Sequence, residues 1–216
     1  MNWREAKIIA FDTETTGLDP IEDRIVQFAF EIFDPPQFTA ELIGLCGTDG
    51  VNISDSAAHV HGLTNEMVAG KPSFDSRLPE ILDFLEFIVK YSKGNYFLLG
   101  YNSPFDLAFL CAALQRCDLT MDFDPLRVVD PVIFARMMWK YGNRLEEVAQ
   151  RLGIDAGKKH DAGWDAKTTV KVLLALEDVP STLDELLVMQ NEGIRAWEKR
   201  SGHEYRDTLK LVGGIE

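Results

Sequence analysis

The chain has 216 residues, of which 46% are hydrophobic and 26% are charged, and its formal net charge is −13. This length and composition are typical of one globular domain of generous size, with room for a sizeable core and a terminal appendage. The acidic balance argues against a protein that coats long nucleic acid, because duplex affinity depends on cationic side chains that contact phosphates.

Strands are predicted to dominate the first part of the chain. Alternating and continuous apolar residues predict three strands, over 7–13, 24–33 and 38–45. Pro35 and Pro36 separate the last two strands, because two successive prolines cannot continue a hydrogen-bonded ladder. The three strands are therefore expected to form an antiparallel meander. The Asn, Ser, Asp and Gly residues of the next stretch, 49–64, predict a loop.

Strands and helices alternate in the rest of the chain. Further strands are predicted over 95–101 and 127–129, and helices over 76–91, 106–117, 130–139, 145–152 and 163–177. Strands first, then strand–helix alternation, predict an α/β fold with a mixed sheet. Ser181 is a predicted N-cap of a last helix, which either packs on the domain or presents Trp197 to a partner. We expect a domain over 1–180 and a helical extension of unknown role over 181–216.

Signals for export or membrane insertion are missing from the sequence. The N-terminal residues lead directly into a predicted strand, and the longest apolar stretches are far shorter than a bilayer span. The three cysteines, Cys46, Cys111 and Cys117, include no CxxC pair and are predicted to be free thiols. We therefore expect a soluble, cytoplasmic protein with no membrane partner.

Two acidic residues, Asp12 and Glu14, directly follow the apolar run of the first predicted strand. Alternate residues of a strand face the same side, so these carboxylates are expected to project together from the strand's end. Carboxylates held this close repel each other unless a cation lies between them. With Asp106 and Asp165 they offer the oxygen-rich environment that Mg²⁺ or Mn²⁺ selects. The pattern is typical of a two-metal phosphodiester hydrolase.

Four motifs then follow one another along the chain. They are Asp12-Thr-Glu14-Thr-Thr-Gly17-Leu18, His61-Gly-Leu-Thr64, Asn102-x-x-Phe105-Asp106 and His160-x4-Asp165. From about residue 5 to about residue 178 the chain resembles the DEDDh 3′–5′ exonucleases (DnaQ-like), and among them most resembles the proofreading epsilon subunits of bacterial replicative DNA polymerases. The resemblance implies a ribonuclease H-like α/β fold, with a mixed five-stranded sheet flanked by helices. It also implies release of nucleoside monophosphates from the 3′ end of single-stranded DNA.

The resemblance further implies a site with two Mg²⁺ ions, for which Mn²⁺ can substitute. Asp12 would bridge the ions, Glu14 and Asp165 would complete the first metal, and Asp106 would support the second. In such hydrolases one ion activates a water and the other stabilises the leaving oxygen. His160 is the candidate general base, because an unperturbed imidazole titrates at about pH 6.5.

The spacing between His160 and Asp165 constrains how both can reach one site. On a single helix they would lie roughly 140° apart, on different faces. They converge only if His160 lies in the entry loop and Asp165 in the first helical turn. Lys158 and Lys159 beside them are candidate phosphate contacts, although paired lysines in a loop are often only solvated.

Substrate contacts are expected from residues that flank the acidic pair. By the same resemblance, Thr15, Gly17 and Leu18 approach the terminal nucleotide, with Leu18 wedged between bases. His61 would face the same pocket, unless it caps the turn that follows it. Phe105 would stack on a base, unless it packs in the core.

Three other interpretations compete with a DNA exonuclease. The His160-Asp161 pair, preceded by His59 and His61, also occurs in HD-type phosphohydrolases, but their all-helical fold conflicts with the predicted strands at 24–45. A non-catalytic nucleic-acid-associated module conflicts with the intact carboxylates. An exoribonuclease of the same family stays open, because a site that accommodates a 2′-hydroxyl admits RNA. A DNA polymerase or another protein partner through 181–216 also stays open, as do roles in proofreading, repair, and phage or defence biology.

Overall fold

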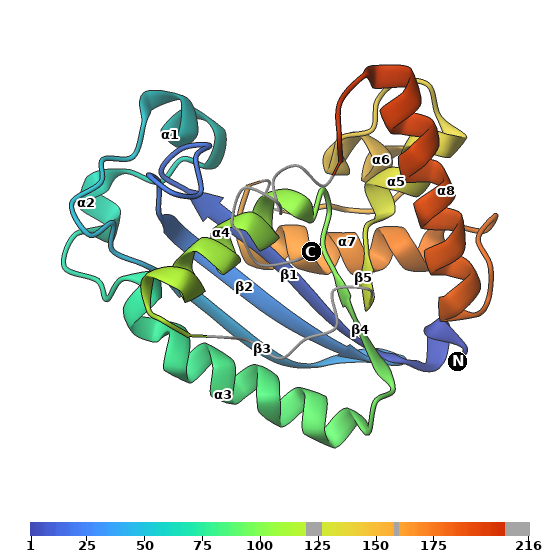
Figure 1. The fold of residues 1–216 in the computed structure, drawn as a ribbon, viewed down its shortest axis with the longest axis horizontal. Coiled ribbons are helices and arrows are strands. Elements are labelled where there is room, and N and C mark those ends of the chain that lie inside the picture. Colours follow the sequence, from blue (N-terminus) through green and yellow to red (C-terminus); the bar gives the residue numbers. More distant parts are fainter. Residues whose placement is uncertain (120–126, 158–159, 206–216) are drawn as a thin grey trace.

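The computed structural model describes residues 1–119, 127–157 and 160–205. A mixed sheet of five strands, in the order β3-β2-β1-β4-β5, has helices on both faces (Figure 1). Its strands are β1 (Lys7–Thr15), β2 (Ile25–Asp34), β3 (Gln37–Leu45), β4 (Tyr96–Leu99) and β5 (Val128–Val129). β1 pairs antiparallel with β2 and parallel with β4, so it is the strand at which the two halves of the sheet meet. The predicted mixed five-stranded sheet is confirmed.

The described residues also form nine helical segments. They are a short 3-10 helix η1 (Trp3–Glu5), α1 (Asp55–His61), α2 (Asn65–Val68), α3 (Phe74–Ser92), α4 (Pro104–Arg116), α5 (Pro131–Met138), α6 (Leu145–Arg151), α7 (Ala162–Ala175) and α8 (Leu183–Ser201). α3 and α4 contact each other, as do α6 and α7, and α5 and α8 (Figure 1). None of the described helices is long and apolar enough to cross a bilayer.

The predicted loop over 49–64 is wrong in part, because α1 lies within it. Ser54 begins this helix by accepting a hydrogen bond from the backbone N–H of Ala57 at 3.2 Å. Gly62 ends it in the left-handed conformation, with φ 74°. Two of the residues that predicted a loop, Ser54 and Gly62, are therefore the caps of a helix. α1 buries none of its residues, so the helix leaves no periodic apolar pattern in the sequence.

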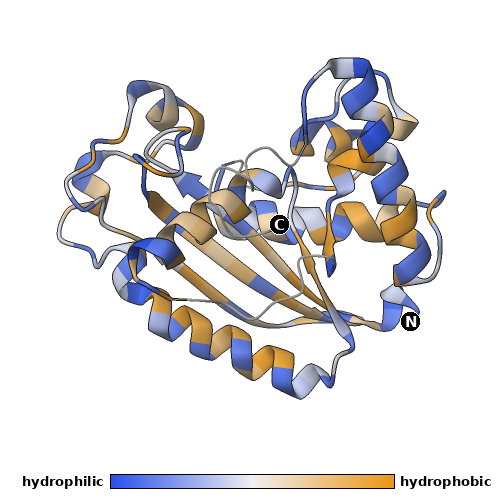
Figure 2. Ribbon diagram, in the orientation of Figure 1, coloured by the Kyte–Doolittle hydropathy of each residue, from blue (hydrophilic) through white to orange (hydrophobic). Residues whose placement is uncertain are grey.

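The alternation of side chains along β1 decides which layer each residue joins. Ile9 and Phe11 belong to the core under α3 and α4, whereas Ile8 and Ala10 belong to the core under α7. Figure 2 shows hydrophobic residues along the central strands and along the helices that cover them. The alternation continues past Ala10 to Asp12 and Glu14, which therefore face the α7 layer at the end of the strand.

The C-terminal helix α8 packs on the domain. Leu183 and Leu186 are buried in the α7-side core, and Ile194 is buried with Val132 and Ile133 of α5. The helix begins one residue later than predicted, because the N-cap is Thr182, whose Oγ1 accepts from the backbone N–H of Glu185 at 3.3 Å. 

Trp197, which was expected either in this packing or at a partner, is partly buried. Its ring lies 4.6 Å from the guanidinium carbon of Arg136. The expected boundary at residue 180 stays a prediction.

Candidate active site

The acidic motifs of three different elements meet at the end of β1. Asp12 and Glu14 belong to β1, Asp106 to the first turn of α4 and Asp165 to the first turn of α7. The charges of the other three all raise the pKa of Asp12, so the four carboxyl groups lie within electrostatic reach of one another. The structure therefore brings together all four carboxylates that the sequence singled out.

The carboxyl groups of this cluster resist ionisation. Burial first, and then its acidic neighbours, raise the pKa of Asp12 well above its usual range. Burial and the charges of Asp165 and Asp106 raise the pKa of Glu14 to about 8. Burial raises the pKa of Asp106 to about 7, and burial raises the pKa of Asp165 to about 6. Each shift reflects an ionised form without enough positive charge around it.

A divalent cation would relieve this repulsion, so the residues present fit a metal site. Oxygen-rich donor sets of carboxylates are those that Mg²⁺ and Mn²⁺ prefer. One ligand atom each from Glu14, His160 and Asp165 already lies within 4.8 Å of the other two. Asp161 adds further negative charge, because it contributes to the raised pKa of Asp12, Glu14 and Asp165.

The histidine and the last carboxylate converge in the way the spacing required. His160 precedes α7 and has a left-handed backbone, with φ 54°, whereas Asp165 lies in the first turn of the helix. Gln27 of β2 fixes the start of α7, because its Oε1 accepts from the backbone N–H of Ala162 at 3.2 Å. Lys167 lies one half-turn beyond Asp165.

The ammonium group of Lys167 ties α7 to two strands. Its Nζ lies 3.1 Å from Oε1 of Glu31 on β2 and 2.8 Å from Oε2 of Glu41 on β3. Glu31 is fully buried, and burial raises its pKa to about 7 in spite of the lysine. These contacts help to hold the helix that carries Asp165 in place.

Two residues that position the cluster were missed by the sequence reasoning. Thr13 lies between the two acids of β1 and donates to Oδ1 of Asp106 twice, from its backbone N–H at 2.9 Å and from Oγ1 at 2.7 Å. Asp130, fully buried after β5, accepts from the backbone N–H groups of Asn102 at 3.0 Å and Ser103 at 2.8 Å. In the sequence, Asp130-Pro131 predicts the start of a helix but gives no sign of the contact with the Asn102–Ser103 turn.

The loop after β1 presents an apolar side chain to solvent. Thr15 is buried, and its Oγ1 donates to the carbonyl of Gly17 at 2.6 Å. A Cβ added at Gly17 would lie 2.3 Å from Oδ2 of Asp23, so a larger residue would displace this carboxylate from its hydrogen bonds with Thr16 and Asp19. The next residue, Leu18, is 83% exposed. This exposure agrees with a contact to substrate, and that contact stays a prediction.

His61 lies against the same loop, with both ring nitrogens engaged by the backbone. The N–H of Leu63 donates to Nδ1 at 3.0 Å, so the proton resides on Nε2, which donates to the carbonyl of Thr15 at 3.1 Å. Burial lowers the pKa of His61, which favours this neutral form. The residue thus joins the end of α1 to the end of β1, and the expected contact with substrate stays a prediction.

Phe105 is only partly available to a ligand. It packs against the core under α3 and α4, and its ring centroid lies 5.0 Å from that of Phe109. Its expected stacking on a base stays a prediction. Lys158 and Lys159, the candidate phosphate contacts, lie outside the described residues.

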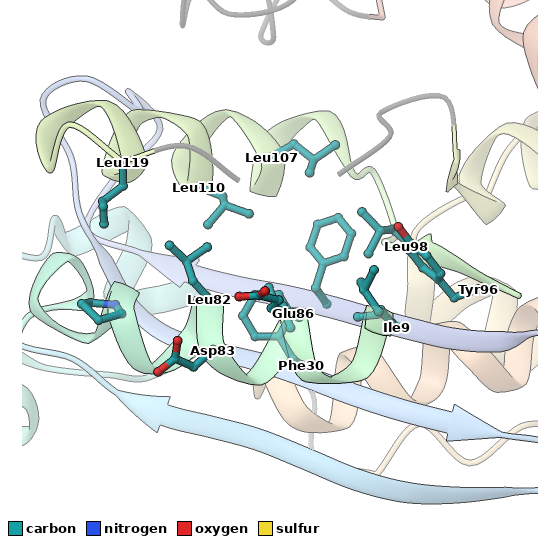
Figure 3. A pocket seen from close by; sticks show the side chains of 14 residues that line it. Ile9, Phe30, Leu82, Asp83, Glu86, Tyr96, Leu98, Leu107, Leu110 and Leu119 are labelled. Atoms are coloured by element: carbon teal, nitrogen blue, oxygen red, sulfur yellow. The ribbon is translucent and has the colours of Figure 1, made fainter. Parts of the chain in front are cut away.

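A large cavity elsewhere in the molecule is separate from the acidic cluster. It measures about 570 Å³ and lies between α3, α4 and the sheet (Figure 3). Leu82 and Glu86 of α3 and Leu107 and Leu110 of α4 contribute to its wall, and none of the four clustered carboxylates does. The cavity therefore does not include the acidic cluster, although α4 contributes residues to both.

Comparisons with known proteins identify the family of the chain. A family model described as "Exonuclease" matches residues 9–173. The DNA polymerase III subunit epsilon of Treponema pallidum is 31% identical over 173 residues, which cover 77% of this chain and 74% of that protein. The PolC-type DNA polymerase III of Thermotoga petrophila is 30% identical over 80% of this chain, which spans only 12% of the length of that polymerase.

A solved structure shares the fold. It is the nuclease domain of 3′hExo, a DEDDh family member, bound to rAMP. This domain is 19% identical in sequence to the chain, with a TM-score of 0.66, over 79% of this chain and 90% of that one. The fold is therefore ribonuclease H-like, as predicted. The all-helical fold of HD-type phosphohydrolases is excluded, because the described residues form a five-stranded sheet.

Proposed function

The chain belongs to this exonuclease family, and we propose that it is a metal-dependent 3′–5′ exonuclease that releases nucleoside monophosphates from single-stranded DNA. The observation that carries the proposal is the meeting of Asp12, Glu14, Asp106 and Asp165, whose pKa values are all raised. Carboxylates crowded in this way repel one another and oppose folding unless a cation binds between them. A purely structural role therefore does not account for the cluster.

Asp12, Glu14, Asp106 and Asp165 are the residues that would hold two divalent cations, with Mg²⁺ as the expected ion. When bound, such ions supply an activated water and charge stabilisation for the leaving oxygen. The contribution of the chain is to fix the ligands on three separate elements. Thr13 orients Asp106 through two hydrogen bonds, and the attachment of α7 to β2 orients Asp165. Positioning of this kind costs nothing at the moment of reaction, because it is established during folding.

His160 is proposed as the general base that takes the proton of the attacking water. It lies beside Glu14 and Asp165 in the loop before α7, so the geometry of the helix does not fix where its ring points. A histidine has its ordinary pKa near neutral pH, which suits proton transfer under physiological conditions. In this role the imidazole would accept the proton, and the neighbouring carboxylates would stabilise the imidazolium that forms.

The substrate and partner are proposed from the named relatives. The epsilon subunit of Treponema pallidum and the PolC-type polymerase are DNA polymerase proteins, which supports DNA as the substrate and a DNA polymerase as a partner. We assign the exonuclease domain to residues 1–180 and a possible partner contact to the extension over 181–216. By the family resemblance, Thr15, Gly17, Leu18, His61 and Phe105 would receive the terminal nucleotide.

A gel assay with labelled oligonucleotides tests this function. Wild-type protein and Asp12→Ala are incubated with 5′-labelled single-stranded DNA or RNA, in Mg²⁺, Mn²⁺ or EDTA. The expected result is a DNA ladder that shortens from the 3′ end with either metal, and no ladder in EDTA or with the variant. Faster shortening of RNA would reassign the substrate to RNA, and intact oligonucleotides with well-folded wild-type protein would refute the proposed activity.

A further inference from the structure

The C-terminal part of the chain reaches a residue that positions the acidic cluster. The link between them is Asp130, a fully buried carboxylate that follows β5 and caps α5. Its Oδ1 accepts from the backbone N–H of Asn102 at 3.0 Å and from that of Val132 at 3.0 Å. Its Oδ2 accepts from the backbone N–H of Ser103 at 2.8 Å. Asp130 thereby fastens the turn that precedes α4 to the start of α5.

This turn sets where α4 begins, and therefore where Asp106 lies. Asn102 has a left-handed backbone, with φ 61°, a conformation that is uncommon in non-glycine residues but that asparagine adopts more readily than most. Ser103 is the N-cap of α4, yet its Oγ contacts Oδ2 of Asp130 at 3.3 Å instead of capping its own helix. Asp106 follows three residues later in the first turn. A shift of the turn would move its carboxylate relative to Thr13.

Two side chains from the C-terminal part hold Asp130 from the other side. Gln190 of α8 is buried; its Oε1 accepts from the backbone N–H of Asp130 at 2.7 Å, and its Nε2 donates to the carbonyl of Val128 at 2.9 Å. The amide thus pairs with the edge of β5 much as a neighbouring strand would. The hydroxyl of Tyr205 donates to Oδ2 of Asp130.

Tyr205 is itself anchored, so its hydroxyl has a defined position. The side chain is 8% exposed and lies in a small core with Val132, Ile133 and Ile194. Its backbone N–H donates to Oε1 of Glu198 at 2.9 Å. A buried carboxylate requires donors for its lone pairs, and a phenol in a fixed place supplies one of them.

We propose that Tyr205 and Gln190 are positioning residues for the metal ligand Asp106, acting through Asp130 and the Asn102–Ser103 turn. The inference rests on the proposed metal-dependent function. It gives the extension beyond residue 180 a role in the geometry of the site, in addition to any contact with a partner. Both side chains lie beyond the segment that the exonuclease family model matches, which ends at residue 173.

Mn²⁺ binding to the full chain tests the proposal. Binding is measured by electron paramagnetic resonance for wild type, Tyr205→Phe and Asp106→Asn, with activity titrated against Mg²⁺ in parallel. Tyr141→Phe, which removes the same hydroxyl from a residue that is 73% exposed, is the matched control. Loss of an outer-shell partner typically weakens metal affinity about tenfold or more. We expect Tyr205→Phe to weaken Mn²⁺ binding and to raise the half-saturating Mg²⁺ concentration by about threefold to tenfold, with kcat at saturating metal changed less.

Several outcomes separate this role from general destabilisation and from the proposed function. A second variant, Glu198→Ala, removes the side-chain oxygen that accepts from the backbone N–H of Tyr205 and should show the same defect at smaller size. Wild-type metal affinity in a folded Tyr205→Phe protein, with Asp106→Asn still defective, would overturn the positioning role alone. Failure of the wild type to bind Mn²⁺, or normal binding in Asp106→Asn, would overturn the proposed metal site and the positioning role with it.

Discussion

Asp130, a fully buried carboxylate near the end of β5, and the cluster of buried and partly buried carboxylates near the end of β1 have different surroundings. Asp130 beside β5 accepts hydrogen bonds from four residues, namely Asn102, Ser103, Val132 and Tyr205. In the cluster at β1, Asp106 accepts from Thr13, while Asp12 and Glu14 are surrounded chiefly by other acids. The hydrogen bonds of the first arrangement lower the pKa of Asp130, although burial still raises it above its usual value, whereas every cause that shifts the pKa of Asp12 and Glu14 raises it.

This difference separates a carboxylate that holds the fold from carboxylates that await a ligand. A buried acid with a full set of donors stabilises the chain around it, so its removal leaves those donors unpaired. Acids that crowd one another oppose folding when ionised, and their removal relieves repulsion. The two groups therefore predict opposite effects on stability for one chemical change, Asp to Asn or Glu to Gln.

The largest expected effect is on activity, at the centre of the cluster. Asp12→Asn removes the proposed bridging ligand and should lower kcat by about 10³-fold or more, because the metal ions provide several kcal/mol of charge stabilisation. Cleavage of labelled DNA measures the loss. Asp184→Asn on α8, whose side chain is 89% exposed, is the control and should keep full activity. An active Asp12→Asn protein would contradict the assignment of the cluster.

The next effect separates metal binding from proton transfer within the same site. His160→Ala should retain Mn²⁺ binding, because four carboxylates remain, yet lose about 10²–10⁴ in kcat, as expected for a general base. Single-turnover rates and calorimetric Mn²⁺ titration measure the two properties separately. His59→Ala is a control histidine variant on α1. Near-normal turnover by His160→Ala would refute the role of the base.

Asp130→Asn tests the other side of the comparison, the hydrogen-bonded carboxylate beside β5. The amide cannot accept from all the donors around Asp130, so we expect the free energy of unfolding to fall by about 2–3 kcal/mol. Urea unfolding measures the change. The carboxylate to amide change at the exposed Asp184 should alter the stability by less than about 0.5 kcal/mol. Unchanged stability in Asp130→Asn would mean that the network is not what holds the Asn102–Ser103 turn.

The smallest expected effect is an increase in stability, in the variant Glu14→Gln. Because the pKa of Glu14 is raised to about 8 in the folded chain, ionisation favours the unfolded chain as the pH rises above about 4.5. In metal-free buffer the amide variant should therefore be more stable than wild type by about 1–2 kcal/mol at pH 8.5, and no more stable at pH 4. Urea unfolding at both pH values measures this. A destabilised variant at pH 8.5 would show that the cluster is not a source of repulsion.

Much of the fold followed from sequence patterns, because most helices have one buried face, β3 alternates between exposed and partly buried residues, and β2 is buried along almost its whole length. Alternation placed β2 and β3, and the apolar run before Asp12 placed β1. α1 was missed because it buries no residue, so no apolar repeat distinguishes it from a loop. The cap of α8 was misplaced by one residue, since Ser181 and Thr182 are both suitable caps and packing decides between them.

The site was predictable where a motif is local and unpredictable where contacts cross the chain. The convergence of His160 and Asp165 followed from helical geometry, because their separation allows only one arrangement. The hydrogen bonds from Thr13 to Asp106 and from Tyr205 to Asp130 join residues 93 and 75 positions apart. Partners at such separations are fixed by tertiary packing, and a single sequence carries no local pattern for them.

Thermal unfolding with and without Mg²⁺, followed from pH 5.5 to 8.5, tests the central claim most directly. The raised pKa values of Glu14, Asp106 and Asp165 mean that the metal-free chain loses stability as the pH rises through this range, while metal binding requires the ionised groups. The account predicts that the increase in Tm caused by Mg²⁺ grows with pH in wild type and is absent in Asp12→Asn. An increase that is independent of pH, or one that persists in the variant, would contradict a metal site built from this cluster.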